Sequence, residues 1–284
     1  MEKKLENGKV TYYRSFEGSL NLAFREWKPQ KPSRKIFLYI HGIESHGSWF
    51  SKTASLLARR GYAVYAPDRR GSGKSEGVRG HLQSYMDTLR DIKVLYNSLK
   101  DGRPDIEIYC IGMSLGASIA VNYSLYYPED FRGLVLLSPA IETKIDLPLK
   151  TKALAFLSSL LAAQKLFPIP IDIDMFAQNR DVIDFIESDP LRVKEVTAKF
   201  YLELLKMKIN HLRKVRKIKT PLITFMAEKD LIIDNDAVIR WMNKLQVPSR
   251  YSIIKGASHS LQLEREDVES VMINSIINWV EGAE

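Results

Sequence analysis

The chain has one cysteine among its 284 residues, Cys110, so an intrachain disulfide is excluded and a reducing, cytoplasmic location is expected. It has no uncharged apolar run long enough to cross a bilayer. Its N-terminal residues lack the apolar core of a secretory signal. His41 and His46 lie close together, but no acidic cluster accompanies them, and the sequence therefore predicts neither a metal site nor a cofactor.

The formal net charge is +8, and the densest basic run is residues 213–219. No nucleic-acid-binding fold or interleaved aromatic residues accompany this run, so a nucleic-acid partner is not expected. A solvated basic face is the simplest interpretation. Peripheral attraction to an anionic membrane surface is the functional alternative. The oligomeric state is left open.

What the chain does contain is enough apolar material for a large core, since 45% of its residues are hydrophobic. From Lys35 onward, apolar strand-like segments alternate with helical ones. This alternation predicts an α/β fold with a mostly parallel central sheet and helices on both faces. Two earlier segments, Val10–Arg14 and Leu20–Trp27, are predicted to form an antiparallel hairpin that begins the sheet.

One motif lies between a predicted strand and a predicted helix: Gly112-Met113-Ser114-Leu115-Gly116. The preceding residues, 106–111, are apolar and β-prone, and the following ones, 117–123, are typical of a buried helix. G-x-S-x-G in this context is the nucleophile-elbow pattern of α/β-hydrolases, in which a tight turn exposes the serine hydroxyl at the C-terminal end of a strand. The context predicts that Ser114 is a nucleophile.

A serine nucleophile needs a base, and two histidines follow Ser114 in the chain. His211 lies in a basic polar stretch with no strand before it. His259 lies in a loop of small residues between the strand-like segment 251–254 and an amphipathic helix that closes the chain. The α/β-hydrolase order is serine, acid, histidine, so we expect His259 to be the base.

The acid is expected directly after the preceding strand, residues 221–227. Asp230 is preferred because it lies in the first turn of the loop, where it can point back towards the sheet edge. Asp234 ranks second and Asp236 third, since both suit the start of a helix predicted from Asn235 to Leu245. Glu228 ranks fourth.

The oxyanion of a tetrahedral intermediate is stabilised by two backbone N–H groups in this fold. One is expected from Leu115, at the N-terminus of the helix after the nucleophile. The other belongs to the loop after the strand Lys35–Ile40. Counting from His41-Gly42, Ile43 is its predicted donor.

From about residue 141 to residue 212 the alternation of strands and helices is interrupted. This segment is strongly apolar over 153–163 and broken by prolines over 166–171. We predict a helical cap inserted after the sixth strand, which divides the hydrolase core into residues 1–140 and 213–284. A helix packed wholly into the core is the alternative. A hydrophobic cap implies an acyl-chain tunnel lined by residues 147–176, because each buried methylene contributes about 0.8 kcal/mol.

Together these features resemble the monoacylglycerol lipase and lysophospholipase group of the α/β-hydrolase superfamily, over nearly the whole chain. The segments that carry the resemblance are residues 39–46, Ala66–Gly77, Arg79–His81, the elbow, Asn179–Asp181 and Ser188–Leu191. The family triad matches Ser114, Asp230 and His259, and its oxyanion pair matches Ile43 and Leu115.

The sequence departs from the family pattern at four places. Met113 and Leu115 flank the serine where the family usually has His and Met. Ile43-Glu44-Ser45 is bulkier than the usual glycine-rich loop, and Ala227 stands where the acid strand usually ends in Gly. None of these departures removes a catalytic group, but they leave the substrate open.

The resemblance implies a serine ester hydrolase that works through an acyl-enzyme on small lipophilic acyl esters, monoacylglycerols first among them. The enzymatic alternatives are a lysophospholipase, a broad carboxylesterase, a thioesterase or an acyltransferase. A catalytically silent ligand-binding protein on the same scaffold is the non-enzymatic alternative, because a fold does not fix a function.

Overall fold

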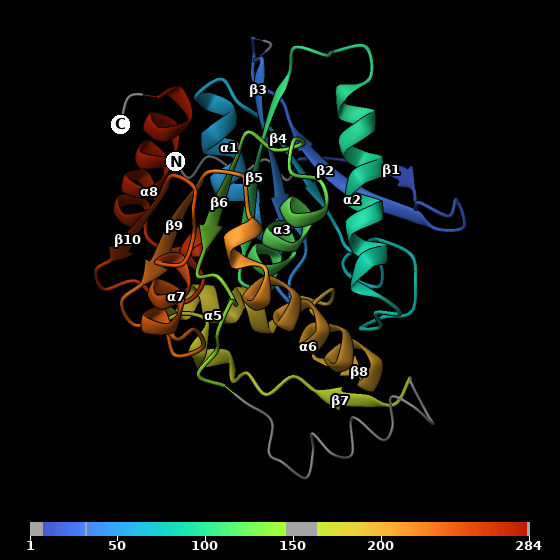
Figure 1. Cartoon of the computed structure of the whole chain (residues 1–284). Helices are drawn as coiled ribbons and strands as arrows, with labels where there is room; N and C mark the ends of the chain where they lie inside the picture. Colours follow the sequence, from blue (N-terminus) through green and yellow to red (C-terminus); the bar gives the residue numbers. More distant parts are fainter. Residues whose placement is uncertain (1–7, 32, 146–163, 283–284) are drawn as a thin grey trace.

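The computed structural model describes residues 8–31, 33–145 and 164–282 (Figure 1). Its central sheet has the strand order β1-β2-β4-β3-β5-β6-β9-β10. Strands β1 (Lys9–Arg14) and β2 (Asn21–Trp27) form the expected antiparallel hairpin, and β2 also pairs antiparallel with β4 (Ala63–Pro67). The other strand pairs of this sheet are parallel, and the prediction of a mostly parallel sheet is confirmed.

Strand β3 (Lys35–Ile40) shows why the parallel strands are apolar throughout. Successive side chains of a strand face opposite sides of the sheet, and both sides are covered by helices. Ile36, Leu38 and Ile40 belong to a core shared with helices α2 (Tyr85–Lys100), α3 (Leu115–Tyr126) and α7 (Asn235–Met242). Phe37 and Tyr39 belong to a second core shared with α1 (Ser51–Arg59) and α8 (Glu266–Glu281). Figure 1 shows α2 and α3 on one side of the sheet and α1 and α8 on the other.

Parallel strands end at a common edge of the sheet, and this edge positions the candidate site. The loop with His41 to His46 follows β3, and the turn of Ser114 follows β5 (Glu107–Met113). Asp230 follows β9 (Leu222–Ala227), which lies between β6 (Gly133–Leu137) and β10 (Ser249–Ile254), and His259 follows β10.

The segment after β6 departs from the alternation, as expected. Within the described residues it contains β7 (Leu166–Pro168), α5 (Arg180–Glu187), β8 (Glu195–Thr197) and α6 (Ala198–Arg213). Strands β7 and β8 pair antiparallel, a small sheet that the sequence did not predict. Residues 146–163, which hold the most apolar part of the predicted cap, lie outside the described residues. In the part of the chain that is described, no helix has the length and apolarity needed to cross a membrane.

Candidate active site

Ser114 stands in the turn between β5 and α3, with backbone angles φ 54° and ψ −116°. Side-chain-bearing residues rarely adopt such a conformation, and it persists only where the surroundings hold it. Here the Ser114 N–H donates to the carbonyl of Leu137 at 2.9 Å. The Ser114 carbonyl accepts from the N–H groups of Ala117 and Ala140 at 3.0 and 3.1 Å. The strained turn is therefore held by its own backbone and by the neighbouring strand.

Close backbone contacts explain the glycines of the elbow. A Cβ atom at Gly112 would lie 2.6 Å from the Cα of Ala117, and one at Gly116 would collide with the carbonyl oxygen of Ile40. A Cβ at Gly42 would lie 3.5 Å from the Cβ of Ser114. The loop after β3 thus runs directly past the serine.

His259 and Asp230 are brought together from two different loops. Nδ1 of His259 lies 3.1 and 3.0 Å from the two carboxylate oxygens of Asp230, and both residues are buried. A carboxylate at this nitrogen keeps the hydrogen on Nδ1 and leaves Nε2 free to accept a proton. Burial raises the pKa of the Asp230 carboxyl, but the charge and hydrogen bond of His259 and the N–H groups of Ile232 and Ile233 outweigh burial and lower it.

The other carboxylates considered for the acid have different partners. Asp234 caps α7 by accepting from the N–H of Ala237 at 2.9 Å, and Asp236 lies in the first turn of that helix, as their ranking assumed. Glu228 accepts from the N–H of Gly256 at 2.8 Å. Of these four, Asp230 is the carboxylate that contacts His259.

The two residues expected to supply the oxyanion donors belong to segments that adjoin Ser114. Leu115 is the first residue of α3, and the first N–H groups of a helix have no partner within it. Ile43 belongs to the loop that passes Ser114 after β3. The structure therefore gathers the predicted nucleophile, base, acid and amide donors at one sheet edge.

Residues 31–266 match the Hydrolase_4 family, described as serine aminopeptidase, S33. The chain belongs to this family. It is 26% identical to human monoglyceride lipase over 90% of this chain and 85% of that one. It is also 26% identical to phospholipase YtpA of Bacillus subtilis, over 85% of this chain and 94% of the relative.

Among solved structures, the monoacylglycerol lipase of Paleococcus ferrophilus superposes with a TM-score of 0.83 at 24% identity, over 93% of this chain and 99% of that one. The expected α/β-hydrolase fold and the expected ester-hydrolase class are confirmed at this level.

The insertion of this hydrolase contacts the acid loop and the base loop. The N–H of Lys144, near its start, donates to the carbonyl of Ile232 at 2.8 Å. Further along, the carbonyl of Phe176 accepts from the N–H of Ser260 at 2.9 Å, and the Phe176 ring lies 5.9 Å from the ring of His259. The described part of the insertion therefore covers the candidate base.

Residues 189–193 of the insertion contact the loop of residues 41–47 that follows β3. The Val193 N–H donates to the carbonyl of Glu44 at 2.9 Å. Nε of Arg192 donates to the Glu44 carboxylate at 2.5 Å, and both side chains are largely buried. Arg192 and Glu44 are 148 residues apart in the chain, and the sequence signal for this contact is limited to the neighbouring family-like segment Ser188–Leu191.

Asp189 also contacts this loop, and it is the hydrogen-bond partner of His46. Its carboxylate accepts from Nε2 of His46 at 2.8 Å and from the Trp49 indole at 2.5 Å. Burial raises the pKa of Asp189, but the hydrogen bonds from His46 and Trp49 prevail and lower it to about 2. Among the described residues, no group of three or more His, Cys, Asp or Glu side chains could hold a metal ion.

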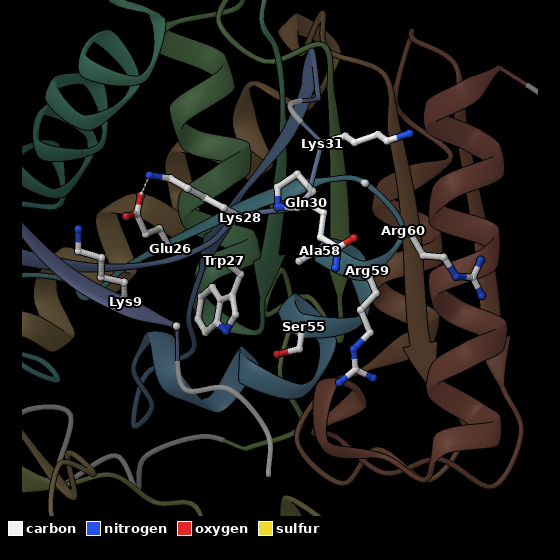
Figure 2. Close-up of a pocket in the computed structure, with 13 residues that line it drawn as sticks. Lys9, Glu26, Trp27, Lys28, Gln30, Lys31, Ser55, Ala58, Arg59 and Arg60 are labelled. Carbon is white, nitrogen blue, oxygen red and sulfur yellow. Dashed lines mark ion pairs between the residues drawn. The ribbon is translucent and has the colours of Figure 1, made fainter. Parts of the chain in front are cut away.

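A separate hollow of about 1100 Å³ lies at the opposite edge of the sheet, between the end of β2 and the end of α1 (Figure 2). It is bordered by several cations, including Lys9, Lys31, Arg59 and Arg60. Figure 2 shows Lys9 and Arg60 extending towards opposite sides rather than into a common centre. We assign no part of the active site to this hollow.

Proposed function

We propose that this hydrolase cleaves small lipophilic acyl esters, monoacylglycerols first among them, to a fatty acid and an alcohol. The observation that carries the proposal is that the strained Ser114 turn and the loops of the buried, paired His259 and Asp230 follow parallel strands of one sheet, and so lie at the same edge of it. The similarity to proteins named monoglyceride lipase supports the choice of substrate.

In the proposed reaction, the Ser114 hydroxyl attacks the ester carbonyl carbon while Nε2 of His259 takes its proton. Asp230 holds the imidazole tautomer and stabilises the imidazolium. The N–H groups of Ile43 and Leu115 donate to the oxyanion. The intermediate collapses, His259 protonates the departing alcohol, and an acyl-serine remains. Water then attacks this ester while His259 takes its proton, and the acyl–Oγ bond breaks as His259 passes that proton to Ser114, which frees the fatty acid and regenerates the serine hydroxyl.

We also propose that residues 141–212 form a cap on a core made of residues 1–140 and 213–284. Phe176 at the His259 ring supports a position over the reacting groups. Phe167 packs instead against Ala198 and Tyr201 within the insertion. The acyl tunnel predicted over residues 147–176 stays a prediction, and much of it falls outside the described residues.

The basic run at residues 213–219 lies just before β9 begins, and so at the edge of the sheet opposite the candidate site. We therefore do not propose this run as a membrane surface that delivers substrate. The cytoplasmic location expected from the single cysteine, which is buried, remains part of the proposal.

A matched substrate panel tests the proposal: monooleoylglycerol, trioleoylglycerol, oleoyl lysophosphatidylcholine and acetyl or butyryl esters, assayed with the purified chain. We expect the monoacylglycerol to have the highest kcat/KM, since a covered site admits one chain and a small head group. Lysophospholipid in first place would favour the second candidate function, a lysophospholipase, to which the similarity to phospholipase YtpA points. A preference for short acyl esters would contradict the lipase assignment.

A further inference from the structure

A buried arginine contacts the loop of residues 41–47 after β3, which holds the proposed donor Ile43 and is called the oxyanion loop below. Nη2 of Arg69 donates to the carbonyl oxygens of Gly42 at 2.8 Å and Ile43 at 3.1 Å. The residue is only 7% exposed, and its Nε has no hydrogen-bond partner among the described groups. Burial lowers the pKa of Arg69 to about 10, so the side chain stays charged at neutral pH. Burying a cation is costly unless its surroundings use the charge.

The Arg69 side chain acts on the peptide group between Gly42 and Ile43. The Gly42 carbonyl and the Ile43 N–H belong to the same planar peptide, and in a trans peptide they point in opposite directions. The carbonyl also accepts from Nδ1 of His41 at 2.8 Å. Nε2 of His41 accepts from the backbone N–H of Arg69 at 3.0 Å, which assigns the hydrogen to Nδ1. Two donors therefore hold the carbonyl on one side and direct the Ile43 N–H to the other.

The residue before Arg69 fixes the far end of the same loop. One carboxylate oxygen of Asp68 accepts from the N–H of Gly47 at 2.7 Å, and the other accepts from the N–H of Lys74 at 2.8 Å. Asp68 and Arg69 follow β4 directly, and β4 is paired with β3. The loop is thus held at both ends by two consecutive residues that directly follow a neighbouring strand.

We propose that Arg69 is a positioning residue of the oxyanion hole: its guanidinium orients and polarises the Gly42–Ile43 peptide so that the Ile43 N–H receives the oxyanion. This inference rests on the proposed function, in which the Ile43 N–H is one of the two donors. A charge-assisted hydrogen bond at the carbonyl oxygen draws electron density from the amide nitrogen and makes its N–H a stronger donor. The gain is largest when the substrate oxygen carries its full negative charge, in the transition state.

Arg69→Met tests the proposal because it keeps much of the side-chain volume and removes the charge and the donors. Loss of a whole oxyanion donor costs about 10²–10³ in kcat. Since His41 still holds the Gly42 carbonyl in this variant, we expect a smaller loss of about 10–100-fold in kcat, with KM changed less than about threefold. Arg69→Lys, which retains a charged donor, should recover part of the lost kcat.

Inhibitor affinity separates positioning from a general structural effect. An alkyl trifluoromethyl ketone forms an anionic tetrahedral adduct with the serine, whereas the matched alkyl ether binds without forming an oxyanion. Arg69→Met should weaken the ketone by about the same factor as kcat and leave the ether nearly unchanged. Arg25→Met is the matched control: Arg25 is a similarly buried arginine on β2, and its loss should leave the ratio of the two affinities unaltered.

Three outcomes would overturn the inference: unchanged kcat in Arg69→Met, equal weakening of ketone and ether, or the same change of ratio in Arg25→Met. If Arg69→Met does not fold, Arg69→Gln is used in its place. Glutamine can donate a hydrogen bond but carries no charge, so we expect this variant also to bind the ketone more weakly and the ether nearly unchanged. A wild-type protein that hydrolyses no ester would instead contradict the proposed function. Wild-type turnover that Arg69→Met and Arg69→Gln leave intact would contradict this inference alone.

Discussion

The ring of Phe176 meets the ring of His259 edge to face, with centroids 5.9 Å apart and planes inclined by 63°. Phe176 comes from the insertion, and its carbonyl accepts from the N–H of Ser260, the neighbour of His259. On its other sides the Phe176 ring lies 6.2 Å from the Trp49 ring and 5.8 Å from the guanidinium of Arg192. A substitution at Phe176 should therefore alter the position of His259, the candidate base.

Phe176→Ala should lower kcat by about tenfold or more, because the imidazole loses the side chain that packs on it and a misplaced base costs orders of magnitude. Phe185→Ala is the matched control, since Phe185 also packs against Trp49 but is 44% exposed. It should change kcat less than about twofold. Equal losses in the two variants would show that the contact with Trp49, and not the contact with His259, matters.

Asp230→Asn should reduce kcat by about 10⁴-fold, because an amide can impose the wrong imidazole tautomer. Asp234→Asn should be nearly normal, since asparagine caps a helix as well as aspartate does. Asp236→Asn should also be nearly normal. Steady-state kinetics of the three variants decide the ranking, and a larger defect in Asp234→Asn or Asp236→Asn would move the acid to that residue.

The contributions of Glu44 and Arg192 to the unfolding free energy should be coupled, because the two side chains form a buried ion pair. Arg192→Met leaves the Glu44 carboxylate buried without its partner, a change that costs about 3–5 kcal/mol of unfolding free energy. Combining it with Glu44→Gln should restore much of this stability. Urea denaturation of the two single variants and the double variant measures the coupling. Additive effects would show that the two charges do not stabilise the insertion against the loop after β3.

The buried His211 should make stability pH-dependent. Its Nδ1 accepts from the Asn122 side chain at 3.0 Å, and burial lowers its pKa to about 4 from an ordinary value of 6.5. Between these values the unfolded chain binds a proton here that the folded chain does not. The unfolding free energy therefore falls as the pH falls, by up to about 1.4 kcal/mol per pH unit.

His211→Gln should remove this contribution, so that the stability of the variant declines less steeply than that of the wild type between about pH 6.5 and pH 4. Denaturant titrations across this range compare the two slopes. Parallel slopes would contradict the assignment of a neutral, buried His211.

Local signals explain why the turn at Ser114 and the pairing of Asp230 with His259 could be predicted. Gly112 is required by contacts within the Ser114 turn and Gly116 by the close approach of β3, and the proposed acid and base each lie in a loop that follows a strand. The small β7–β8 sheet and the ion pair of Glu44 with Arg192 have no such signal, because each depends on pairing between distant segments.

The contacts of Arg69 also could not be predicted from the sequence. Its segment was recognised as family-like, but a buried guanidinium on two carbonyl groups is visible only when the loops after β3 and β4 are placed together.

The central claim is that Ser114 is the nucleophile of a lipid ester hydrolase, and fatty acid release from a long-chain monoacylglycerol tests it most directly. Wild type and Ser114→Ala should be compared at equal concentrations of folded protein, because the substitution removes a single hydroxyl. We predict ready release by the wild type and a loss on the order of 10⁶-fold in kcat in Ser114→Ala, with unchanged thermal unfolding. Release by Ser114→Ala at more than about one hundredth of the wild-type rate would contradict the account.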